Sequence, residues 1–514
     1  MTELDRKAIP ISEPDIKPND EVFHLEDVPT KPGDGGIVVL TAEEKARVKH
    51  LVRRIDLRML GIVLMYIMNQ LDRSNMPAAR LKGFQKDLKM TDSEYSAVIS
   101  ILYVGYIFAQ VPSNLLLNYC GRPSLYLPFW MVCWGIVSAC TGICTSFAGA
   151  FVCRLVLGWV ESPLFPGAIF VLSKWYTRKE LAKRVTMLWM ANFISNALNG
   201  LISAGILAGT DGLRGHPGWR WLFWIDGAMT IFLALCMVFI IPDFPHNDRW
   251  LSFSDRALAQ KRLALETGEA DEDSDMSLLT TLKLVVTDIK CWLVLLSVFG
   301  QLIAQSFQQF FPTIVATLGY GSTDSLLLTC PPWVFAGIVA YVNAYYSDKR
   351  GRRFEHLIGP YFIALIGFII AATTTKPGPR YVSMFLMCTV NAGYLLNYPW
   401  LSAIIPRPPA KRAVAIAFVN SLGNLATVAG SFIFPTKWAP RYYQTWAVMC
   451  VAIAFAVTMA LSLRLHLVRL NKKMDQGSYI DENGRMQVAA LTNEALSGSQ
   501  RVAEGNVTVW RYQL

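Results

Sequence analysis

Charged residues are scarce in this chain of 514 residues: aspartate, glutamate, lysine and arginine make up only 17% of it. A typical soluble protein has roughly 25%. Hydrophobic residues make up 53%, and apolar stretches of about 20 residues, the length that a helix needs to cross a bilayer, recur along the sequence. A segment inside lipid must satisfy its own backbone hydrogen bonds. The composition therefore excludes an ordinary soluble protein and predicts an all-α membrane protein.

A nucleic-acid motif is also missing, although the net charge is +10. The basic residues stand mostly in short clusters between apolar runs, as the residues that orient membrane helices do. We therefore expect the lipid bilayer, and no nucleic acid, as a partner of this chain.

Motifs of metal binding and catalysis are missing as well. The ten cysteines are scattered, with no CxxC pair and no Cys/His cluster. Cys140 and Cys144 lie one helical turn apart and could be a metal or disulfide pair, but we interpret them as small apolar helix residues. No Walker A, GxSxG or HExxH motif occurs. We expect neither an enzyme nor an ATP-driven pump, and no metal or cofactor.

The order of polar and apolar segments predicts two bundles. No signal-peptide pattern precedes the first apolar run near Met59, so the polar leader is expected to be a disordered cytosolic tail. The predicted parts are this tail (1–54), a first six-helix bundle (55–241), a cytosolic central loop (242–286), a second six-helix bundle (287–468) and a cytosolic tail (469–514). The twelve membrane helices are predicted near 55–78, 94–118, 123–145, 148–175, 182–209, 219–241, 287–312, 324–346, 354–374, 380–405, 411–435 and 442–467.

The loops differ in their basic residues. Lysine and arginine are more frequent in the loops on the side of both chain ends, although several also occur in the first loop on the other side. By the positive-inside rule both termini are cytosolic. We expect a multi-pass monomer, most simply placed in the plasma membrane.

The two halves of the sequence repeat each other. Aligning Gly351 with Gly121, 230 residues apart, matches YYSDKRGRR to LNYCGRP. AKRAVAIAFVNSLGN (410–424) matches AKRVTMLWMANFISN (182–196) at a spacing of 228. Two parallel repeats are an architecture of transporters, with the substrate site between the halves.

Several motifs are similar to those of a known family. The run from Asp348 to Arg353, DKRGRR, resembles the loop signature D-[RK]-x-G-[RK]-[RK] of the major facilitator superfamily, although Ala344 replaces an upstream glycine. RLVLGWVESPLFPG (154–167), GWRWLFWIDG (218–227) and APRYY (439–443) resemble its anion:cation symporter family, in the fungal allantoate and nicotinate permease branch. The resemblance covers about residues 50 to 470. It implies a major facilitator fold and a substrate such as nicotinate, pantothenate or allantoate.

The loop signature has a physical interpretation. Asp348 is expected to cap a helix end and to pair with loop arginines, so that the cytoplasmic helix ends latch together as the halves move. The alternative is that the bases only anchor the topology. The predicted gating residues are Asp348, Arg350, Gly351, Arg352 and Arg353.

Ionisable residues inside membrane spans are costly and indicate function. LDRSN (71–75) places Asp72 and Arg73 in the first span, and Arg154 and Glu161 stand two helical turns apart in the fourth. Arginine offers a rigid fork for a carboxylate, and a buried carboxyl group can take up a proton. We predict that Arg73 and Arg154 bind an organic anion and that Asp72 and Glu161 carry protons, as the resemblance also implies. The alternative is a structural salt bridge between the two helices.

Uncharged polar side chains complete the predicted substrate site, unless they only join helices. Three glutamines of the seventh span would lie on one face. The further binding residues predicted are Asn69, Gln301, Gln305, Gln308, Asn391, Asn397 and Trp400. Asp226 could equally be functional or structural. The repeated pairs Asn192/Asn196 and Asn420/Asn424 are interpreted as packing contacts, and the prolines of ESPLFPG and LLNYPW as bends in the fourth and tenth helices.

Together these features predict a secondary active transporter that imports a small organic anion with protons by alternating access. Two alternatives stay open. One is an exporter of an acidic metabolite on the same fold, and the other is a membrane nutrient sensor that binds without transporting.

Overall fold

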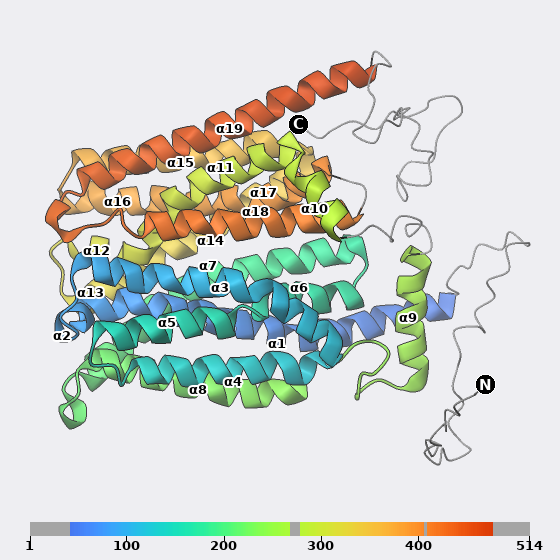
Figure 1. Cartoon of the computed structure of the whole chain (residues 1–514), viewed down its shortest axis with the longest axis horizontal. Coiled ribbons are helices and arrows are strands. Elements are labelled where there is room, and N and C mark those ends of the chain that lie inside the picture. Colours follow the sequence, from blue (N-terminus) through green and yellow to red (C-terminus); the bar gives the residue numbers. More distant parts are fainter. Residues whose placement is uncertain (1–41, 268–277, 406–408, 476–514) are drawn as a thin grey trace, which may run out of the picture. The chain divides into compact units, whose positions relative to one another are not determined.

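The computed structural model describes residues 42–267, 278–405 and 409–475. Met1–Ala46 and Arg47–Leu514 form two separate units, and the arrangement given below is that of the second. Residues 1–41 and 476–514 of the expected tails, and 268–277 of the expected central loop, lie outside the described residues. Within the described ranges the chain is helical (Figure 1), as the apolar runs predict.

The described part of the first half, from Ala42 to Ile240, contains eight α-helices and one short 3₁₀ helix. They are α1 (Ala42–Leu81), α2 (Phe84–Asp87), α3 (Asp92–Cys120), α4 (Pro123–Thr141), α5 (Phe147–Glu161), α6 (Leu164–Trp175), α7 (Arg178–Thr210), η2 (Leu213–Gly215) and α8 (Gly218–Ile240). Because α1 begins at Ala42, the end of the expected tail is already helical. The expected central loop contains α9 (Phe253–Thr267) and α10 (Leu278–Val286).

The second half has the same general plan. It contains α11 (Ile289–Gln305), η3 (Ser306–Phe310), α12 (Phe311–Ala316), α13 (Ser322–Leu327), α14 (Cys330–Arg350), α15 (Arg353–Thr373), α16 (Pro377–Cys388), α17 (Val390–Ile404), α18 (Pro409–Gly430), η4 (Thr436–Trp438) and α19 (Tyr443–Asp475). Helix α19 continues past the predicted span end at 467.

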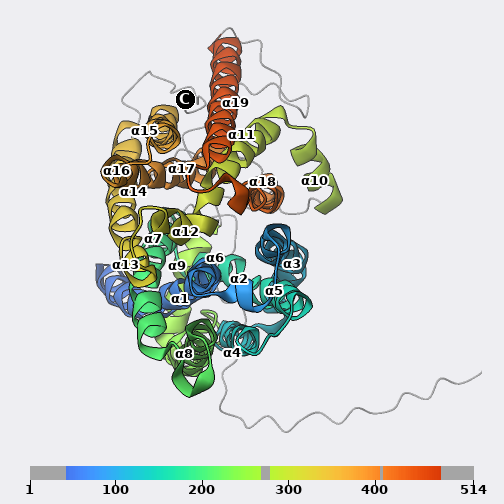
Figure 2. The same cartoon turned by 90° about the vertical axis from the view of Figure 1, so that its left-hand side faces the viewer.

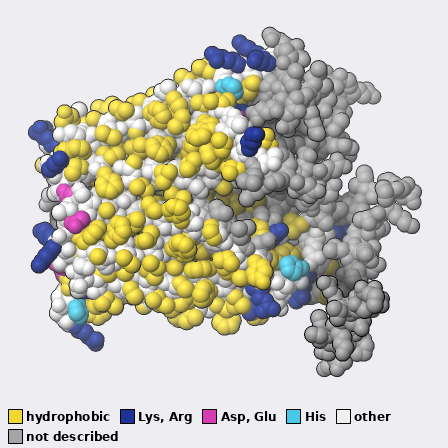
Figure 3. All heavy atoms as spheres, viewed as in Figure 1, with side chains coloured by type: hydrophobic (Ala, Val, Ile, Leu, Met, Phe, Trp, Pro, Cys, Tyr) yellow, Lys and Arg dark blue, Asp and Glu magenta, His cyan; other side chains and the backbone are white. Residues whose placement is uncertain are grey.

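Each of the predicted spans overlaps one long helix or a pair of consecutive helices. Nine helical segments in the described chain are long and apolar enough to cross a membrane. The other three membrane-length segments are α1, α3 and the pair α16–α17, so twelve spans are consistent with the structure. On the face shown in Figure 3, hydrophobic side chains cover the sides of the helices, and lysine and arginine side chains lie toward the two ends. This surface suits a surrounding lipid phase.

The sequence repeat has a structural counterpart at two helix ends. Gly121 ends α3 with φ 65°, and Gly351 ends α14 with φ 66°. Both amides donate to the carbonyl four residues earlier, on Leu117 and Ser347. Only glycine takes this left-handed conformation without strain, so the glycine shared by the two loop copies has one backbone role.

A second pair of equivalent contacts joins the first and fifth spans of each half. In the first half Arg184 on α7 donates two hydrogen bonds of 2.8 Å to Asp56 on α1. In the second half Lys411 on α18 lies 2.9 Å from Asp288, which caps α11. Arg184 and Lys411 come from the two copies of the AKR repeat. Each half is thus held together at the same end by an acid and a base.

Glycines allow two helix pairs of the first half to approach closely. A Cβ on Gly105 of α3 would lie 2.3 Å from the Leu155 carbonyl oxygen, and one on Gly158 of α5 would lie 2.0 Å from that of Leu102. Gly135 of α4 faces Gly227 of α8 in the same way. The contacts of Gly105 and Gly158 hold α5, which carries two of the predicted site residues, against α3.

The two halves pack on each other through α7 against α13 and α14, and through α3 against α18. Figure 2 shows α3, α4, α5 and α8 below and α11, α15, α18 and α19 above. At the end of the bundle with α2 and α13, which we call the far end, Asp92 accepts hydrogen bonds from the Thr436 amide (2.7 Å) and hydroxyl (2.5 Å). Nearer the opposite end, the Trp189 ring stacks on Tyr398 with centroids 6.0 Å apart. Side-chain contacts therefore join the halves near both ends.

Candidate functional site

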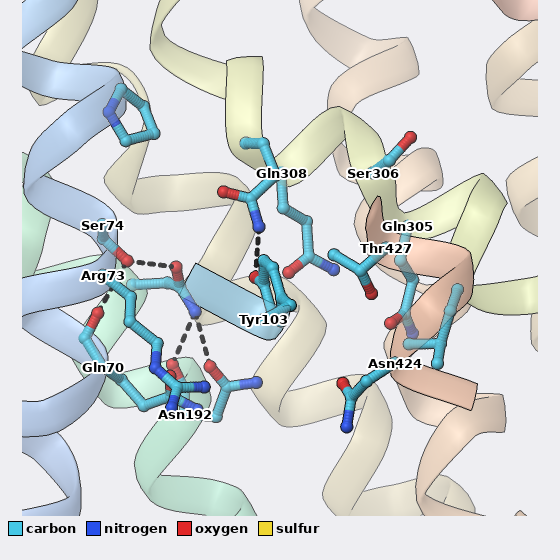
Figure 4. Close-up of a pocket in the computed structure, with 14 residues that line it drawn as sticks. Gln70, Arg73, Ser74, Tyr103, Asn192, Gln305, Ser306, Gln308, Asn424 and Thr427 are labelled. Carbon is cyan, nitrogen blue, oxygen red and sulfur yellow. Dashed lines mark hydrogen bonds between the residues drawn. The ribbon is translucent and has the colours of Figure 1, made fainter. Parts of the chain in front are cut away.

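A polar cavity of about 150 Å³ lies between the two halves (Figure 4). The first half contributes α1, α3 and α7, and the second contributes α11, η3 and α18. The lining residues are Gln70, Arg73, Ser74, Pro77, Tyr103, Asn192, Asn196, Leu302, Gln305, Ser306, Gln308, Gln309, Asn424 and Thr427. Arg73 is the single ionisable base among them, and the other polar groups are amides and hydroxyls.

Broken helices place polar groups beside this cavity. The seventh span changes from α-helix to 3₁₀ helix at Ser306–Phe310, and Ser306, Gln308 and Gln309 line the cavity at this break. The fourth span is interrupted at Ser162 and Pro163, so Glu161 is the last residue of α5. Interrupted membrane helices can offer backbone and side-chain groups to a ligand, provided that they face a cavity or protein rather than lipid.

The tenth span breaks at Thr389, between α16 and α17, rather than at Pro399 of LLNYPW. The Thr389 hydroxyl donates to the carbonyls of Leu386 (2.7 Å) and Pro360 (3.2 Å), and such side-chain bonds compete with regular helix. Pro399 is accommodated inside α17. The expected bend in the fourth helix, by contrast, coincides with Pro163 of ESPLFPG.

Five ionisable side chains gather beside the cavity in the first half, and we call them the buried charge cluster. They are Asp72 and Arg73 on α1, Arg154 and Glu161 on α5, and Asp226 on α8. Arg73 Nε donates to Glu161 Oε2 at 2.6 Å, joining the first and fourth spans. The Arg73 guanidinium also lies over the Tyr106 ring, 4.8 Å from its centroid. Glu161 is fully buried, whereas the Arg73 side chain is 19% exposed.

The two aspartates form the other side of the cluster. Asp72 accepts a hydrogen bond from the Ser138 hydroxyl on α4, and Asp226 accepts one of 2.8 Å from the Asn75 amide. Asp72 and Asp226 lie close enough to interact, and both feel the charge of Arg154. Asp226, which the sequence left open, thus belongs to the same cluster as the predicted residues.

Arg154 has an unusual environment for a buried base. It is 2% exposed, and its Nε and Nη2 atoms have no hydrogen-bond partner among the described residues. Its guanidinium lies 5.8 Å from the centroid of the Phe223 ring and within electrostatic range of Asp72 and Glu161. Glu161 Oε1 and Asp72 Oδ2 also lack partners within the described chain. Unpartnered buried polar atoms are uncommon in folded proteins, and their presence on three residues of one cluster marks this region as unusual.

The charges in this cluster do not cancel. Three carboxyl groups face two guanidinium groups, and four of the five side chains are at most 3% exposed. A net negative charge inside a medium of low dielectric constant is unfavourable. The cluster thus joins an excess of buried carboxyl groups to Arg73, a base that lines the cavity.

The predicted binding residues fall into three groups. Arg73, Gln305 and Gln308 line the cavity. Asn391 accepts a hydrogen bond of 2.8 Å from Gln308, and it therefore supports a lining residue without lining the cavity itself. The predicted residues that lie elsewhere in the described structure are Asn69, Arg154, Gln301, Asn397 and Trp400.

Gln301 of the seventh span does not line the cavity, unlike Gln305 and Gln308. It is fully buried, accepts hydrogen bonds from the Tyr361 hydroxyl and from Asn397 (2.9 Å), and so joins α11 to α15 and α17. Trp400 packs against Phe354, with ring centroids 6.2 Å apart.

Several lining residues were not predicted as binding residues. Asn192, Asn196 and Asn424 were interpreted as packing residues, yet all three line the cavity. Asn196 also donates to Asn192, and Asn424 donates to the Asn420 carbonyl, both over one helical turn. The sequence feature that sets these asparagines apart is their repetition in both halves at a spacing of 228 residues. Nothing comparable marked Ser74, Tyr103 or Thr427.

The predicted gating loop makes local contacts. Arg353 lies 3.3 Å from Asp348, and Arg352 lies 3.4 Å from Glu355. The Arg350 guanidinium lies 5.6 Å from the centroid of the Tyr346 ring. Asp348 thus pairs with a loop arginine across Gly351, but the expected cap is absent: Asp348 lies inside α14, and the N-cap of α15 is Arg352, without a side-chain hydrogen bond.

Comparisons with known proteins agree with this geometry. Residues 62–431 match the family model of the Major Facilitator Superfamily. The chain is 32% identical over 452 residues to the MFS-type transporter cnsO of Penicillium expansum, covering 84% of this chain and 86% of the relative. It is 29% identical to an Agrobacterium vitis protein that carries the provisional name of a tartrate transporter, covering 77% of this chain and 86% of that protein.

A solved structure shows the same fold. A bacterial homologue of the human lysosomal transporter Spinster, in an inward-facing and occupied conformation, superposes with a TM-score of 0.63. The match covers 84% of this chain and 98% of that one at 14% identity.

A helical membrane fold with two repeated halves and a polar cavity between them defines a secondary transporter. This chain belongs to the major facilitator superfamily, whose members are transporters and not enzymes.

Proposed function

We propose that this transporter carries a small organic anion into the cell together with protons, by alternating access. The proposal includes membership of the anion:cation symporter family, in the allantoate and nicotinate permease branch. The single observation that supports it best is the 2.6 Å bond between Arg73, which lines the cavity, and the buried Glu161. The chain further acts as a monomer in the plasma membrane with both termini in the cytosol.

The Arg73–Glu161 pair offers a mechanism of coupling. While Glu161 is ionised, it occupies the Arg73 guanidinium, and the cavity lacks a free cation. A proton on Glu161 removes that competitor, and Arg73 can then turn its charge to a substrate carboxylate. Proton uptake and anion binding therefore favour each other, which is the thermodynamic requirement for symport.

The other cluster residues have supporting roles in the proposal. Asp72 carries protons, and Asp226 beside it shares this role because the two carboxyl groups face one another inside the protein. Arg154 balances the buried negative charge and can reach the substrate when the helices move. Gln305 and Gln308, with Asn391 behind them, offer hydrogen bonds to the rest of the anion.

The similar Agrobacterium vitis protein is named for tartrate, an organic anion, and this supports a carboxylate substrate. Amides and hydroxyls make up the other polar groups of the cavity lining. They suit a compact anion with further hydrogen-bonding atoms better than a simple hydrocarbon acid.

The test is uptake of labelled carboxylates, including nicotinate, pantothenate, allantoate and tartrate, into proteoliposomes under an imposed pH gradient. We expect at least one to accumulate when the outside is acidic, and a protonophore should abolish the accumulation. Binding without uptake would instead identify a sensor. Accumulation that ignores the pH gradient would contradict proton coupling. Loss of an internal metabolite only from cells that contain the protein would identify an exporter.

A further inference from the structure

Two cysteines outside the proposed transport site lie next to each other. Cys144 is in the turn between α4 and α5, and Cys153 is on the second turn of α5. Their sulfur atoms are 3.7 Å apart. Neither is fully buried.

The surrounding turn is built to hold this position. Arg220 of α8 donates to the Gly142 carbonyl at 2.7 Å, and a Cβ on Gly142 would lie 2.5 Å from the Trp224 Nε1 atom. Gly142 is therefore pressed against α8, and a larger residue would not fit. On the other side of Cys144, the Ser146 side chain caps α5 by accepting from the Gly149 amide at 3.4 Å. Both ends of the turn are thus fixed.

Gly149 leaves room for the Cys144 side chain to lie over α5. A Cβ on Gly149 would be 3.4 Å from the Cys144 sulfur and 3.7 Å from its Cβ atom. A disulfide requires the two sulfurs to approach to about 2.05 Å, which each atom reaches from 3.7 Å by moving less than about 1 Å.

We propose that Cys144 and Cys153 form a redox-modification site, a dithiol that closes to an intramolecular disulfide by exchange with a low-molecular-weight disulfide. In the topology proposed above this turn faces the outside of the cell, where disulfides persist.

The exchange is balanced in sulfur, hydrogen and electrons. The thiolate of one cysteine attacks a sulfur of the small disulfide, forms a mixed disulfide and releases one thiolate, which takes up the proton that the cysteine lost. The second cysteine then attacks the sulfur of the first and releases the other small thiol. Two protein thiols are oxidised, and the one disulfide bond of the co-reactant is reduced to two thiols.

Closure would have a defined structural effect. The new bond would tie the α4–α5 turn to the residue that immediately precedes Arg154 of the buried charge cluster. The outer part of α5 would then be fixed at two points, the Ser146 cap and the disulfide.

The test treats the purified full-length protein in nanodiscs with oxidised glutathione, alkylates the remaining thiols and maps the peptides by mass spectrometry after chymotrypsin digestion. We expect a Cys144–Cys153 link, seen as the loss of two hydrogen atoms, and its reversal by dithiothreitol. A link between Cys140 and Cys144, or separate glutathione adducts on the two cysteines, would overturn the proposal. So would two thiols that remain fully alkylated.

Variants separate the pair from its neighbour. Cys153→Ser should leave Cys144 as a stable mixed disulfide with glutathione, because the resolving thiol is missing. Cys140→Ser is the matched control, since Cys140 is exposed one turn before Cys144, and the link should form as in the unmodified protein. If Cys153→Ser does not fold, the peptide map of the unmodified protein decides the question. None of these measurements depends on the transported substrate.

Discussion

Arg73 joins the two parts of the candidate site. Its side chain lines the cavity, and its Nε atom bonds to Glu161 in the protein interior. Most buried bases in membrane proteins serve either a ligand or a neighbouring acid. In the proposed mechanism Arg73 binds Glu161 and the substrate anion in turn. Substitutions of Arg73 and Glu161 therefore test this change of partner most directly.

Replacing the buried acid tests the exchange. Glu161→Gln keeps the size of the side chain but can neither carry a charge nor release a proton. We expect proton-driven accumulation to be lost while substrate exchange across the membrane continues, because Arg73 remains free for the anion. Uptake with and without a pH gradient, and counterflow, measure the two activities. Asp324→Asn, at an exposed aspartate of α13, is the control and should behave as the unmodified protein. Full accumulation by Glu161→Gln would remove this residue from the coupling mechanism.

Replacing the cation tests anion binding. Lysine keeps the charge of Arg73 but loses the planar fork, and a hydrogen bond to a charged group contributes about 1.5–3 kcal/mol. We expect Arg73→Lys to bind substrate roughly tenfold to a hundredfold more weakly. Arg154→Lys should have a smaller effect on affinity, since Arg154 does not line the cavity. Competition between labelled and unlabelled carboxylate gives both affinities. Unchanged affinity in both variants would mean that another group holds the anion.

The sequence could reveal which residues are charged inside the membrane, but not how they pair. Spacing within α5 relates Arg154 to Glu161 on one helix. The bond from Glu161 to Arg73 depends on how α1 is rotated against α5, and this rotation follows from packing such as the approach of Gly158 to α3. The salt bridge that was considered as a structural alternative is therefore present, and the proposed function gives it a coupling role.

At the scale of the helices, the long apolar runs were the reliable signal because lipid leaves a buried backbone few alternatives to helix. The breaks were harder to foresee. Pro163 marked one of them, but the break at Thr389 depends on contacts with Pro360 of a neighbouring helix. The 3₁₀ segment from Ser306 has no proline or glycine directly before it, and it brings Ser306, Gln308 and Gln309 to the cavity.

The contact between α3 and α5 predicts a measurable loss of stability. Gly158→Ala places a methyl group 2.0 Å from the Leu102 carbonyl oxygen, so one helix must shift. Overpacking of this kind typically costs about 1–3 kcal/mol, and we expect a lower thermal unfolding temperature in detergent.

Gly205→Ala on α7 is the matched control, because no atom lies within 4 Å of the added methyl group. Its unfolding temperature should be unchanged or slightly higher, since alanine favours helix over glycine. Equal unfolding temperatures for the two variants would show that the close approach of α3 and α5 is not needed for stability.

At the scale of the whole transporter, a polar contact joins the two halves at the far end. Asp92 of α3 binds Thr436, and Arg80 lies 3.3 Å from both Asp92 and the Thr436 hydroxyl. Alternating access requires such contacts to break and re-form. They are therefore expected to set how often the cavity opens at this end.

Asp92→Ala should increase that opening. A cysteine introduced at Ser74, which lines the cavity, should react faster with a membrane-impermeant maleimide added from the far end. Asp211→Ala is the control, because Asp211 pairs with Lys82 inside the first half at 3.3 Å and does not join the halves. The same labelling rate in both variants would show that Asp92 does not hold the far end closed.

The far-end contact should also resist mild acid. Partial burial alone would raise the pKa of Asp92, but hydrogen bonds from Thr436 and Gln85 and the nearby Arg80 outweigh it and lower the pKa below its ordinary value of 3.8. A carboxylate with a lowered pKa stabilises the folded contact above its ordinary pKa and loses this effect only as the pH falls through the lower value. The labelling rate of the cysteine at position 74 should thus be constant from neutral to mildly acidic pH. An increase in that range would assign the far-end opening to protonation of Asp92.

The cavity lining is chemically unequal. The first half supplies Arg73 and the buried acids behind it, whereas the second half supplies Leu302 and only neutral amides and hydroxyls. In the proposed mechanism the proton-carrying residues therefore lie in the first half, whereas both halves contact the anion. During evolution, substitutions at Gln305, Gln308 or Asn424 could change which anion is accepted while the proposed proton-carrying residues stay intact. The same fold could thus acquire a new substrate through few substitutions.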